Sequence, residues 1–325
     1  MATYKEIHGV KVQYRDSDAT AIEGDVWYNA STGLLKMYAS AGSWASGGNV
    51  NTARYGLAGG GTPTAAWIAS GYAPSAPGVT VDHEQYDGSS WTETTNVNTA
   101  RTYIGSAGTA TAALVVSGFL DPGASVDTES WNGSAWTELA NLNASRYNGA
   151  SFGTNTAAIF VSGLALPPNV ASASCEQWNG SSWTEVANIN TGRNSLQSCG
   201  TGTVTAGIAI GGPVTESWNG NSWTEIADLN TARTSGMASG TSTVCIYAGG
   251  PGSPRSVVVE SFDGSSWTAE SSMSTGRNNA GTGSTAATSL ATFVAAGSIG
   301  GGPPDSTNVT EEWSYSASVE TVAFD

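Results

Sequence analysis

The chain has 325 residues, and its composition excludes several kinds of partner before any motif is considered. Only 11% of the residues are charged, the formal net charge is −15, and the three lysines all precede residue 37. Because phosphate binding needs clustered Lys and Arg, this charge disfavours nucleic acid and anionic membrane surfaces as partners. The 42 glycines and 12 tryptophans favour short strands around an aromatic core.

Residues 1–41 precede the repeats and form an N-terminal extension. The start, MATYKEIHGVKVQYRDSD, lacks the apolar segment of a signal peptide, and no run of 18 apolar residues occurs in the chain. We therefore expect neither a cleaved signal nor membrane insertion.

A tryptophan followed ten residues later by an arginine recurs six times after this extension. Successive tryptophans are 40 to 47 residues apart. Such a period, with no helical segment inside it, is typical of a four-stranded propeller blade, which must stack on neighbouring blades to bury its faces. We predict an all-β, six-bladed β-propeller over residues 42–325. The pairs are Trp44 and Arg54, Trp91 and Arg101, Trp136 and Arg146, Trp183 and Arg193, Trp223 and Arg233, and Trp267 and Arg277.

One repeat predicts the four strands of a blade, here named a to d from the inside outward. The segments TYIGSAG, ALVVSG, TESWNG and AWTELA follow Arg101 in that order. Asn-Gly or Asp-Gly occupies the c–d turn in five repeats, as expected for tight hairpins. Small residues suit the crowded inner strand, and tryptophan fills the wider space at the outer strand.

This pattern resembles the kelch-type propeller. A Gly pair follows strand b at Gly211–Gly212 and Gly249–Gly250, and strand c has Glu and an aromatic residue, as in Glu216 and Trp218. Three repeats have Ser-Gly instead of the pair, at Ser70, Ser117 and Ser162. Repeats such as NTARYGLAGGGTPTAA, and the segment 24–38, look similar to those of bacteriophage proteins, the latter to a virion hairpin module. The resemblance implies a virion or tail-associated protein made in the host cytoplasm, and it leaves the function open.

The two ends of the chain indicate how the ring closes. The last repeat has its strand c at residues 311–315, but Ser318 stands where the outer tryptophan is expected. Trp44 supplies a tryptophan near the other end of the chain. We therefore expect the N-terminal strand around residues 42–46 to complete the last blade and hide its edge, with residues 316–325 as a tail. An outer strand from residues 318–322 is the alternative.

Six repeat arginines allow two interpretations. An arginine ring could bind an anion, but each repeat also has a strand-c glutamate, and a planar guanidinium pairs well with a carboxylate. We favour a structural role for the arginines and for the six tryptophans. These glutamates are Glu84, Glu129, Glu176, Glu216, Glu260 and Glu311 or Glu312.

Signatures of catalysis or metal binding are scarce. GASFG around Ser151 matches a nucleophile motif but falls on a predicted inner strand. His8 and His83 are the only histidines, too few for a copper site, and the acids Asp82, Asp121, Asp127 and Asp305 lack a dense calcium pattern. Cys175, Cys199 and Cys245 lie at different repeat positions, which predicts buried free thiols. We expect no cofactor, no metal and no catalytic residue.

The b–c loops vary most between repeats, as expected of a scaffold that presents a binding surface on one face. Tyr72, Phe119 and Leu164 share one position at the base of these loops, where they either pack against each other or form an exposed apolar stripe. We therefore predict a non-enzymatic phage propeller that binds a host surface glycan or a protein through this face. One alternative is a structural virion component docked to other virion proteins through residues 1–41. The other is an enzyme acting on polysaccharide.

Overall fold

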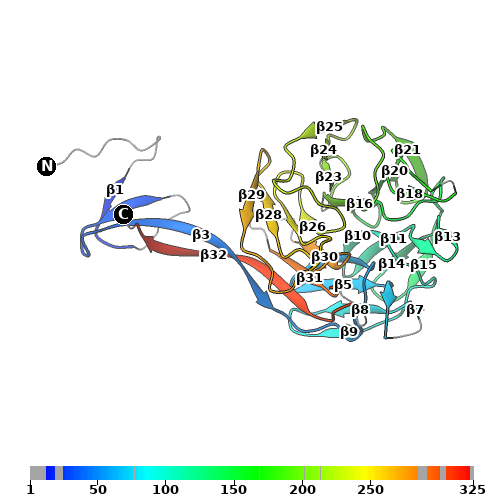
Figure 1. Cartoon of the computed structure of the whole chain (residues 1–325), viewed down its shortest axis with the longest axis horizontal. Coiled ribbons are helices and arrows are strands. Elements are labelled where there is room, and N and C mark those ends of the chain that lie inside the picture. Colours follow the sequence, from blue (N-terminus) through cyan, green and yellow to red (C-terminus); the bar gives the residue numbers. More distant parts are fainter. Residues whose placement is uncertain are drawn as a thin grey trace. The chain divides into compact units, whose positions relative to one another are not determined.

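The computed structural model describes residues 12–18, 25–75, 78–167, 169–200, 202–212, 214–284, 291–300 and 305–322. All regular elements in these ranges are β-strands, as predicted (Figure 1). The chain divides into two compact units, Met1–Ser43 with Ser314–Asp325, and Trp44–Trp313. Within the described ranges, the search for an apolar helix of membrane-spanning length finds none.

The described part of the Trp44–Trp313 unit contains five four-stranded antiparallel sheets, here called the first to fifth blades in chain order. The first two are β4 (Ala58–Thr62), β5 (Ala65–Ala69), β8 (His83–Tyr86) and β9 (Trp91–Glu93), then β10 (Gly105–Thr109), β11 (Ala112–Val116), β14 (Thr128–Trp131) and β15 (Trp136–Glu138). The third is β16 (Ala150–Gly153), β17 (Ala158–Val161), β20 (Cys175–Trp178) and β21 (Trp183–Val186). The fourth is β22 (Gln197–Cys199), β23 (Gly207–Gly211), β24 (Val214–Trp218) and β25 (Trp223–Ile226), and the fifth is β26 (Met237–Gly240), β27 (Cys245–Ala248), β28 (Val259–Phe262) and β29 (Trp267–Glu270).

The first three blades each have a small two-stranded hairpin in the b–c loop. The sequence of these segments varies between repeats and predicts loops without regular structure. The hairpins are β6 (Tyr72–Ala73) with β7 (Gly78–Val79), β12 (Phe119–Leu120) with β13 (Gly123–Ala124), and β18 (Leu164–Ala165) with β19 (Val170–Ala171).

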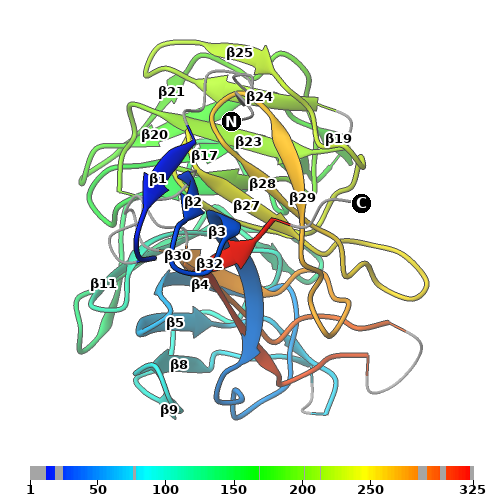
Figure 2. The ribbon, with the colours of Figure 1, turned by 90° about the vertical axis from the view of Figure 1, so that its left-hand side faces the viewer.

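One further sheet, here called the composite sheet, joins strands from both ends of the chain. Its order is β1-β2-β3-β32-β31-β30, and β3 and β32 lie side by side (Figures 1 and 2). We predicted a tail at residues 316–325. The structure instead places this segment in β32 as far as Thr321. Its strands are β1 (Gln13–Arg15), β2 (Val26–Asn29), β3 (Leu34–Ser46), β30 (Gly281–Ser284), β31 (Thr292–Ala295) and β32 (Thr310–Thr321).

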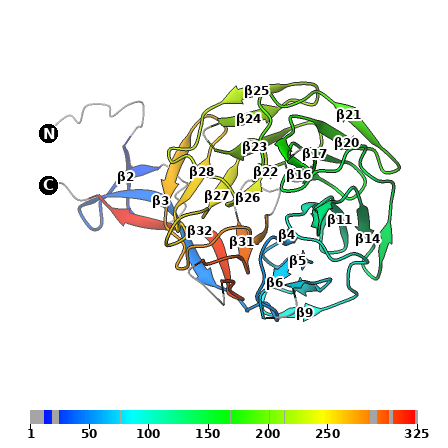
Figure 3. The same cartoon turned by 45° about the vertical axis from the view of Figure 1, so that its right-hand side comes forward.

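The innermost strands of these sheets surround an axis (Figure 3). β4, β10, β16, β22, β26 and β30 each contact the next in this order, and β30 contacts β4. Glycine permits this approach: a Cβ added to Gly59 would lie 2.9 Å from the Cα of Gly281, closer than real Cβ atoms come.

Aromatic pairs fill the outer part of the sheets. In each blade the strand-d tryptophan packs on the strand-c aromatic residue, and Trp44 packs on Trp313 with ring centroids 5.3 Å apart. Each indole Nε1 also donates a hydrogen bond to the preceding sheet or the loop after it, which joins neighbouring sheets at their outer edges. The acceptors are Ser271 O for Trp44, Thr310 Oγ1 for Trp91, His83 Nδ1 for Trp136, Thr128 Oγ1 for Trp183, Ala187 O for Trp223 and Ala227 O for Trp267.

The cysteines differ in part from the prediction. Cys175 is a buried free thiol, but Cys199 and Cys245 form a disulfide, so the prediction of free thiols is wrong for these two. Cys199 lies on the first strand of the fourth blade and Cys245 on the second strand of the fifth, with their Cα atoms 6.1 Å apart. Two different repeat positions therefore meet where neighbouring blades pack together.

Candidate ligand-binding face

All six repeat arginines are ion-paired, and five of them are buried, while the side chain of Arg193 is 11% exposed. Each guanidinium contacts a strand-c glutamate, with N–O distances of 2.6 to 3.0 Å for four of the pairs. The pairs are Arg54–Glu84, Arg101–Glu129, Arg146–Glu176, Arg193–Glu216, Arg233–Glu260 and Arg277–Glu311.

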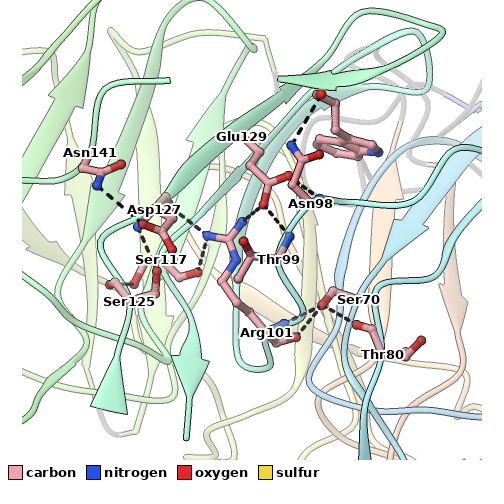
Figure 4. Close-up of polar contacts among 11 residues, drawn as sticks. Ser70, Thr80, Asn98, Thr99, Arg101, Ser117, Ser125, Asp127, Glu129 and Asn141 are labelled. Carbon is pink, nitrogen blue, oxygen red and sulfur yellow. Dashed lines mark hydrogen bonds and ion pairs between the residues drawn. The ribbon is translucent and has the colours of Figure 1, made fainter. Parts of the chain in front are cut away.

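Arg101 illustrates how the two terminal nitrogens of such a guanidinium are used (Figure 4). Its Nη2 donates to Glu129 Oε1 at 2.7 Å, and its Nη1 donates to the carbonyl oxygens of Ser117 and Asp127. Burial lowers the pKa of Arg101, and the neighbouring Glu129 carboxylate opposes that shift. Since the side chain is 1% exposed, this arginine holds b–c and d–a connections together and is not available to a ligand.

The Ser-Gly departures from the kelch pattern also have a structural explanation. Ser70 has φ of 58°, and its hydroxyl donates to Arg101 O while accepting from Arg101 N. Ser162 has φ of 60° and makes the same two contacts with the backbone of Arg193. A serine at this left-handed position therefore joins one blade to the arginine of the next.

His83 is fully buried in the first blade, on β8. Burial lowers its pKa to about 4. Its Nδ1 lies 2.7 Å from Thr94 Oγ1 and 3.2 Å from Trp136 Nε1. Because Thr128 and Thr310 occupy the same place in their own sheets and accept from a tryptophan, the role of His83 is structural.

A cavity of about 330 Å³ follows the axis between the inner strands. Its described lining contains no Asp, Glu, Lys, Arg, His or Cys. Ser151, the serine of the nucleophile-like motif, lies on inner strand β16 of this lining, with no acid or base in the lining to activate it. Equivalent strand-a positions in the lining are Gly59, Ser106, Ser151, Ser198, Ala238 and Thr282.

One end of the cavity is bordered by a closed ring of backbone hydrogen bonds. Six residues, each two positions before an inner strand, have φ between 51° and 65°, and the N–H of each donates to the carbonyl oxygen of the equivalent residue before the neighbouring inner strand. A left-handed backbone costs about 1 kcal/mol or more for a residue other than glycine, and the shared hydrogen bonds offset that cost. The six residues are Gly56, Tyr103, Asn148, Ser195, Ser235 and Asn279.

Aromatic side chains of the first three blades gather near this end of the cavity, whose lining includes Tyr103. Tyr72, on the first hairpin, is 38% exposed, and its ring centroid lies 5.3 Å from that of Tyr55. Phe119, on the second hairpin, is half-buried and lies 5.2 Å from Tyr147, which is in turn 6.2 Å from Tyr103. Leu164, on the third hairpin, is half-buried and forms an isolated β-bridge with Tyr147. The three predicted ligand-binding residues therefore lie on one face, together with tyrosines that sequence analysis does not select.

Tyr55 and Tyr147 directly follow a repeat arginine, and Tyr103 follows one by two positions. The other repeats have Thr or Asn directly after the arginine and Gly, Ser or Asn one position further. The sequence therefore contained a signal for these three tyrosines, because they stand at positions where the other repeats have small or polar residues.

The predicted loop acids do not form a metal site in the described residues, where no group of three metal-ligating side chains occurs. Asp127 accepts a hydrogen bond from Asn141 at its side chain and from Arg101 at its carbonyl.

No protein-family model and no curated protein matches the sequence. Among solved structures, one titled "Structure of YjhT" matches with a TM-score of 0.67 and 13% sequence identity, covering 81% of this chain and 95% of the other. The shared fold is a β-propeller. At this identity the likeness concerns the fold alone.

Proposed function

We propose that this propeller is a kelch-like, non-enzymatic component of a bacteriophage virion or tail, and that it binds a host surface glycan or a protein partner through its b–c face. The observation that supports binding most directly is the cluster of partly exposed aromatic rings near the end of the cavity. Aromatic side chains offer apolar area at little conformational cost, and a few such anchors dominate most interfaces.

The uncharged cavity supports the non-enzymatic part of the proposal. General acid–base chemistry needs titratable groups within reach of the substrate. The only titratable side chain in the described lining is Tyr103, and burial together with Tyr147 raises its pKa. An enzyme acting on polysaccharide would need its catalytic groups elsewhere.

We further propose that the ring has six blades and that β3 completes the last one. Trp44 supports this proposal, because it packs on Trp313 and donates to Ser271 O in the way that the other outer tryptophans contact the preceding sheet. Backbone hydrogen bonds from Gly47 to Thr310 and from Val50 to Asn308 continue the contact.

The test of binding is the double substitution Tyr72→Ser with Phe119→Ser, assayed for adhesion to host cells and on a glycan array. We expect a folded double variant to lose binding. Tyr14→Ser is the matched control, because Tyr14 is 74% exposed and lies in the other unit. Unchanged binding by the double variant would move the site away from the b–c face.

A structural role through the N-terminal extension is the second candidate. The observation that favours it is the exposure of apolar residues there, with Val12 at 42%, Tyr14 at 74% and Met37 at 37%. If Tyr14→Ser prevents incorporation into particles while the double variant of the b–c face is incorporated and active, this second candidate is preferred.

A further inference from the structure

Arg255 differs from every repeat arginine in its surroundings. It lies on the b–c loop between β27 and β28, is half-buried, and has no ion-pair partner among the described residues. Its Nη2 donates to Ser298 Oγ at 3.3 Å, and its Nε is buried without a hydrogen-bond partner. The Nε of Arg54, Arg101 and Arg193 is likewise unpartnered, so the feature that distinguishes Arg255 is a guanidinium without a carboxylate partner among the described residues.

Asp305 lies close to this arginine on the b–c loop between β31 and β32. Ile299 N donates to the carbonyl oxygen of Asp305, and Ile299 stands between Ser298 and Gly300, which both lie against Arg255. The Asp305 carboxylate likewise has no ion-pair partner in the described structure, so the two opposite charges are neighbours without contacting each other within 4.0 Å.

Both charges act on the tyrosines at the cavity end. Burial raises the pKa of Tyr55 to about 12, with Tyr103 and Asp305 adding to the shift and Arg255 opposing it. Tyr103 responds to Asp305 and Arg255 in the same directions, and it lines the cavity. Ser298, which Arg255 contacts, is hydrogen-bonded to Asn278, and the next residue, Asn279, also lines the cavity. The hydrogen bonds from Arg255 to Ser298 and from Ser298 to Asn278 therefore place the charged pair next to Asn279, at the edge of the cavity. We call Tyr55, Tyr103, Arg255, Ser298 and Asp305 together the channel mouth, and Tyr103 is its member in the described cavity lining.

We propose that the channel mouth binds a neutral saccharide unit. Asp305 accepts hydrogen bonds from its hydroxyl groups, Arg255 donates to its oxygens, and a tyrosine face packs on its apolar face. This assignment rests on the proposed binding function of the b–c face and names its ligand class.

Charge complementarity favours a neutral ligand over a charged one. An anion would be attracted by Arg255 but repelled by Asp305 and by the net charge of −15. A cation would be attracted by Asp305 and by the net charge of −15, but Arg255 would repel it, and an ammonium group offers no acceptor to the guanidinium N–H groups. A polyhydroxylated neutral ring satisfies both unpaired groups at once, because each hydroxyl both donates and accepts.

The test uses the full chain and a panel of neutral methyl glycosides of glucose, galactose, mannose and N-acetylglucosamine, with glucuronate and galacturonate as charged counterparts. Binding is measured by ligand-observed NMR and calorimetry. Each variant must first retain the melting temperature of the parent protein. We expect at least one neutral glycoside to bind, its uronate counterpart to bind more weakly at low salt, and Arg255→Gln and Asp305→Asn each to weaken binding about tenfold or more.

Asp87→Asn is the matched control for Asp305→Asn. This substitution removes the same charge from an exposed c–d turn, at a position where other repeats already have Asn. The variant should therefore bind the glycoside like the parent protein. Three results would each overturn the proposal. Asp305→Asn and Asp87→Asn could weaken binding equally, a uronate could bind more tightly than its neutral counterpart, or no neutral glycoside could bind. Cell adhesion separates this proposal from the proposed function. If the Tyr72→Ser, Phe119→Ser variant loses adhesion while Arg255→Gln adheres normally, the b–c face remains the binding surface and the channel mouth is rejected.

Discussion

The six repeat arginines and Arg255 have the same side chain but opposite surroundings. Each repeat arginine sits between two sheets, contacts a buried glutamate and donates to backbone carbonyls. Arg255 lies outside the period, on a loop, with one hydroxyl contact. In this molecule, therefore, a residue repeated in every blade stabilises the stacking of blades, and residues that break the period are the better candidates for binding.

The largest effect that separates the two classes is expected from Arg101→Met. Glu129 is fully buried, and the substitution leaves its charge without a guanidinium, at a cost of about 3–5 kcal/mol in the free energy of unfolding. Denaturant unfolding measures this loss. Adding Glu129→Gln should recover part of it, because the amide oxygen still accepts from Asn98 N. A loss below about 1 kcal/mol in the single variant would contradict the structural role.

Trp44→Ala is expected to cost about 3 kcal/mol, near the lower end for tryptophan because Trp44 is half-buried. The lost interactions are the packing on Trp313 and the hydrogen bond to Ser271 O. Trp44→Phe, which keeps an aromatic ring, should lose less. Parent-like stability of the alanine variant would remove the support for the six-bladed closure.

His83 makes the stability of the fold depend on pH. Its pKa falls from 6.5 in the unfolded chain to about 4 in the fold, so the unfolded state binds the proton more tightly. Stability is therefore lost as the pH falls from about 6.5 to about 4, by about 3 kcal/mol in total. His83→Thr introduces the residue that three other sheets have at this place, Thr128, Thr215 and Thr310, and it should remove that part of the acid sensitivity. Identical pH profiles of the two proteins would show that His83 does not titrate in this way.

The smallest effect on stability is expected from Arg255→Gln, within about 0.5 kcal/mol of the parent protein. The side chain is half-buried on a loop and has no ion-pair partner among the described residues. Thermal unfolding beside Arg101→Met makes the comparison direct. A destabilisation as large as that of Arg101→Met would place Arg255 with the structural arginines.

Features tied to the period could be predicted from the sequence. Trp, Arg and Glu recur at fixed spacings because each blade presents the same surfaces to its neighbours, so one repeat suffices to infer the strands and the arginine–glutamate pairs. The disulfide could not be inferred in this way, since it joins two different repeat positions. Its sequence separation of 46 residues, about one period, was the available clue that Cys199 and Cys245 lie in neighbouring blades.

The candidate site was predicted only in part for the same reason. Tyr72, Phe119 and Leu164 share a repeat position, so alignment of the repeats brings them together. Arg255 and Asp305 lie on b–c loops of different sequence and length, so alignment of the repeats does not pair them, and only the folded ring brings them together through Ser298 and Ile299. Periodicity identifies which residues are equivalent, and it does not identify which non-equivalent residues meet.

The pairing of β3 with β32 has a consequence for biosynthesis. The ribosome makes β3 before any of the five blades and β32 after all of them. The two strands are therefore neighbours in the sheet, although they are synthesised at widely separated times. Until β32 emerges, Trp44 lacks its partner Trp313 and the outer edge of β31 has unpaired backbone groups. Such non-local pairing slows folding, and an open strand edge invites association between nascent chains. Premature termination before Thr310 should therefore yield chains that aggregate, even though every blade up to β29 has already been synthesised.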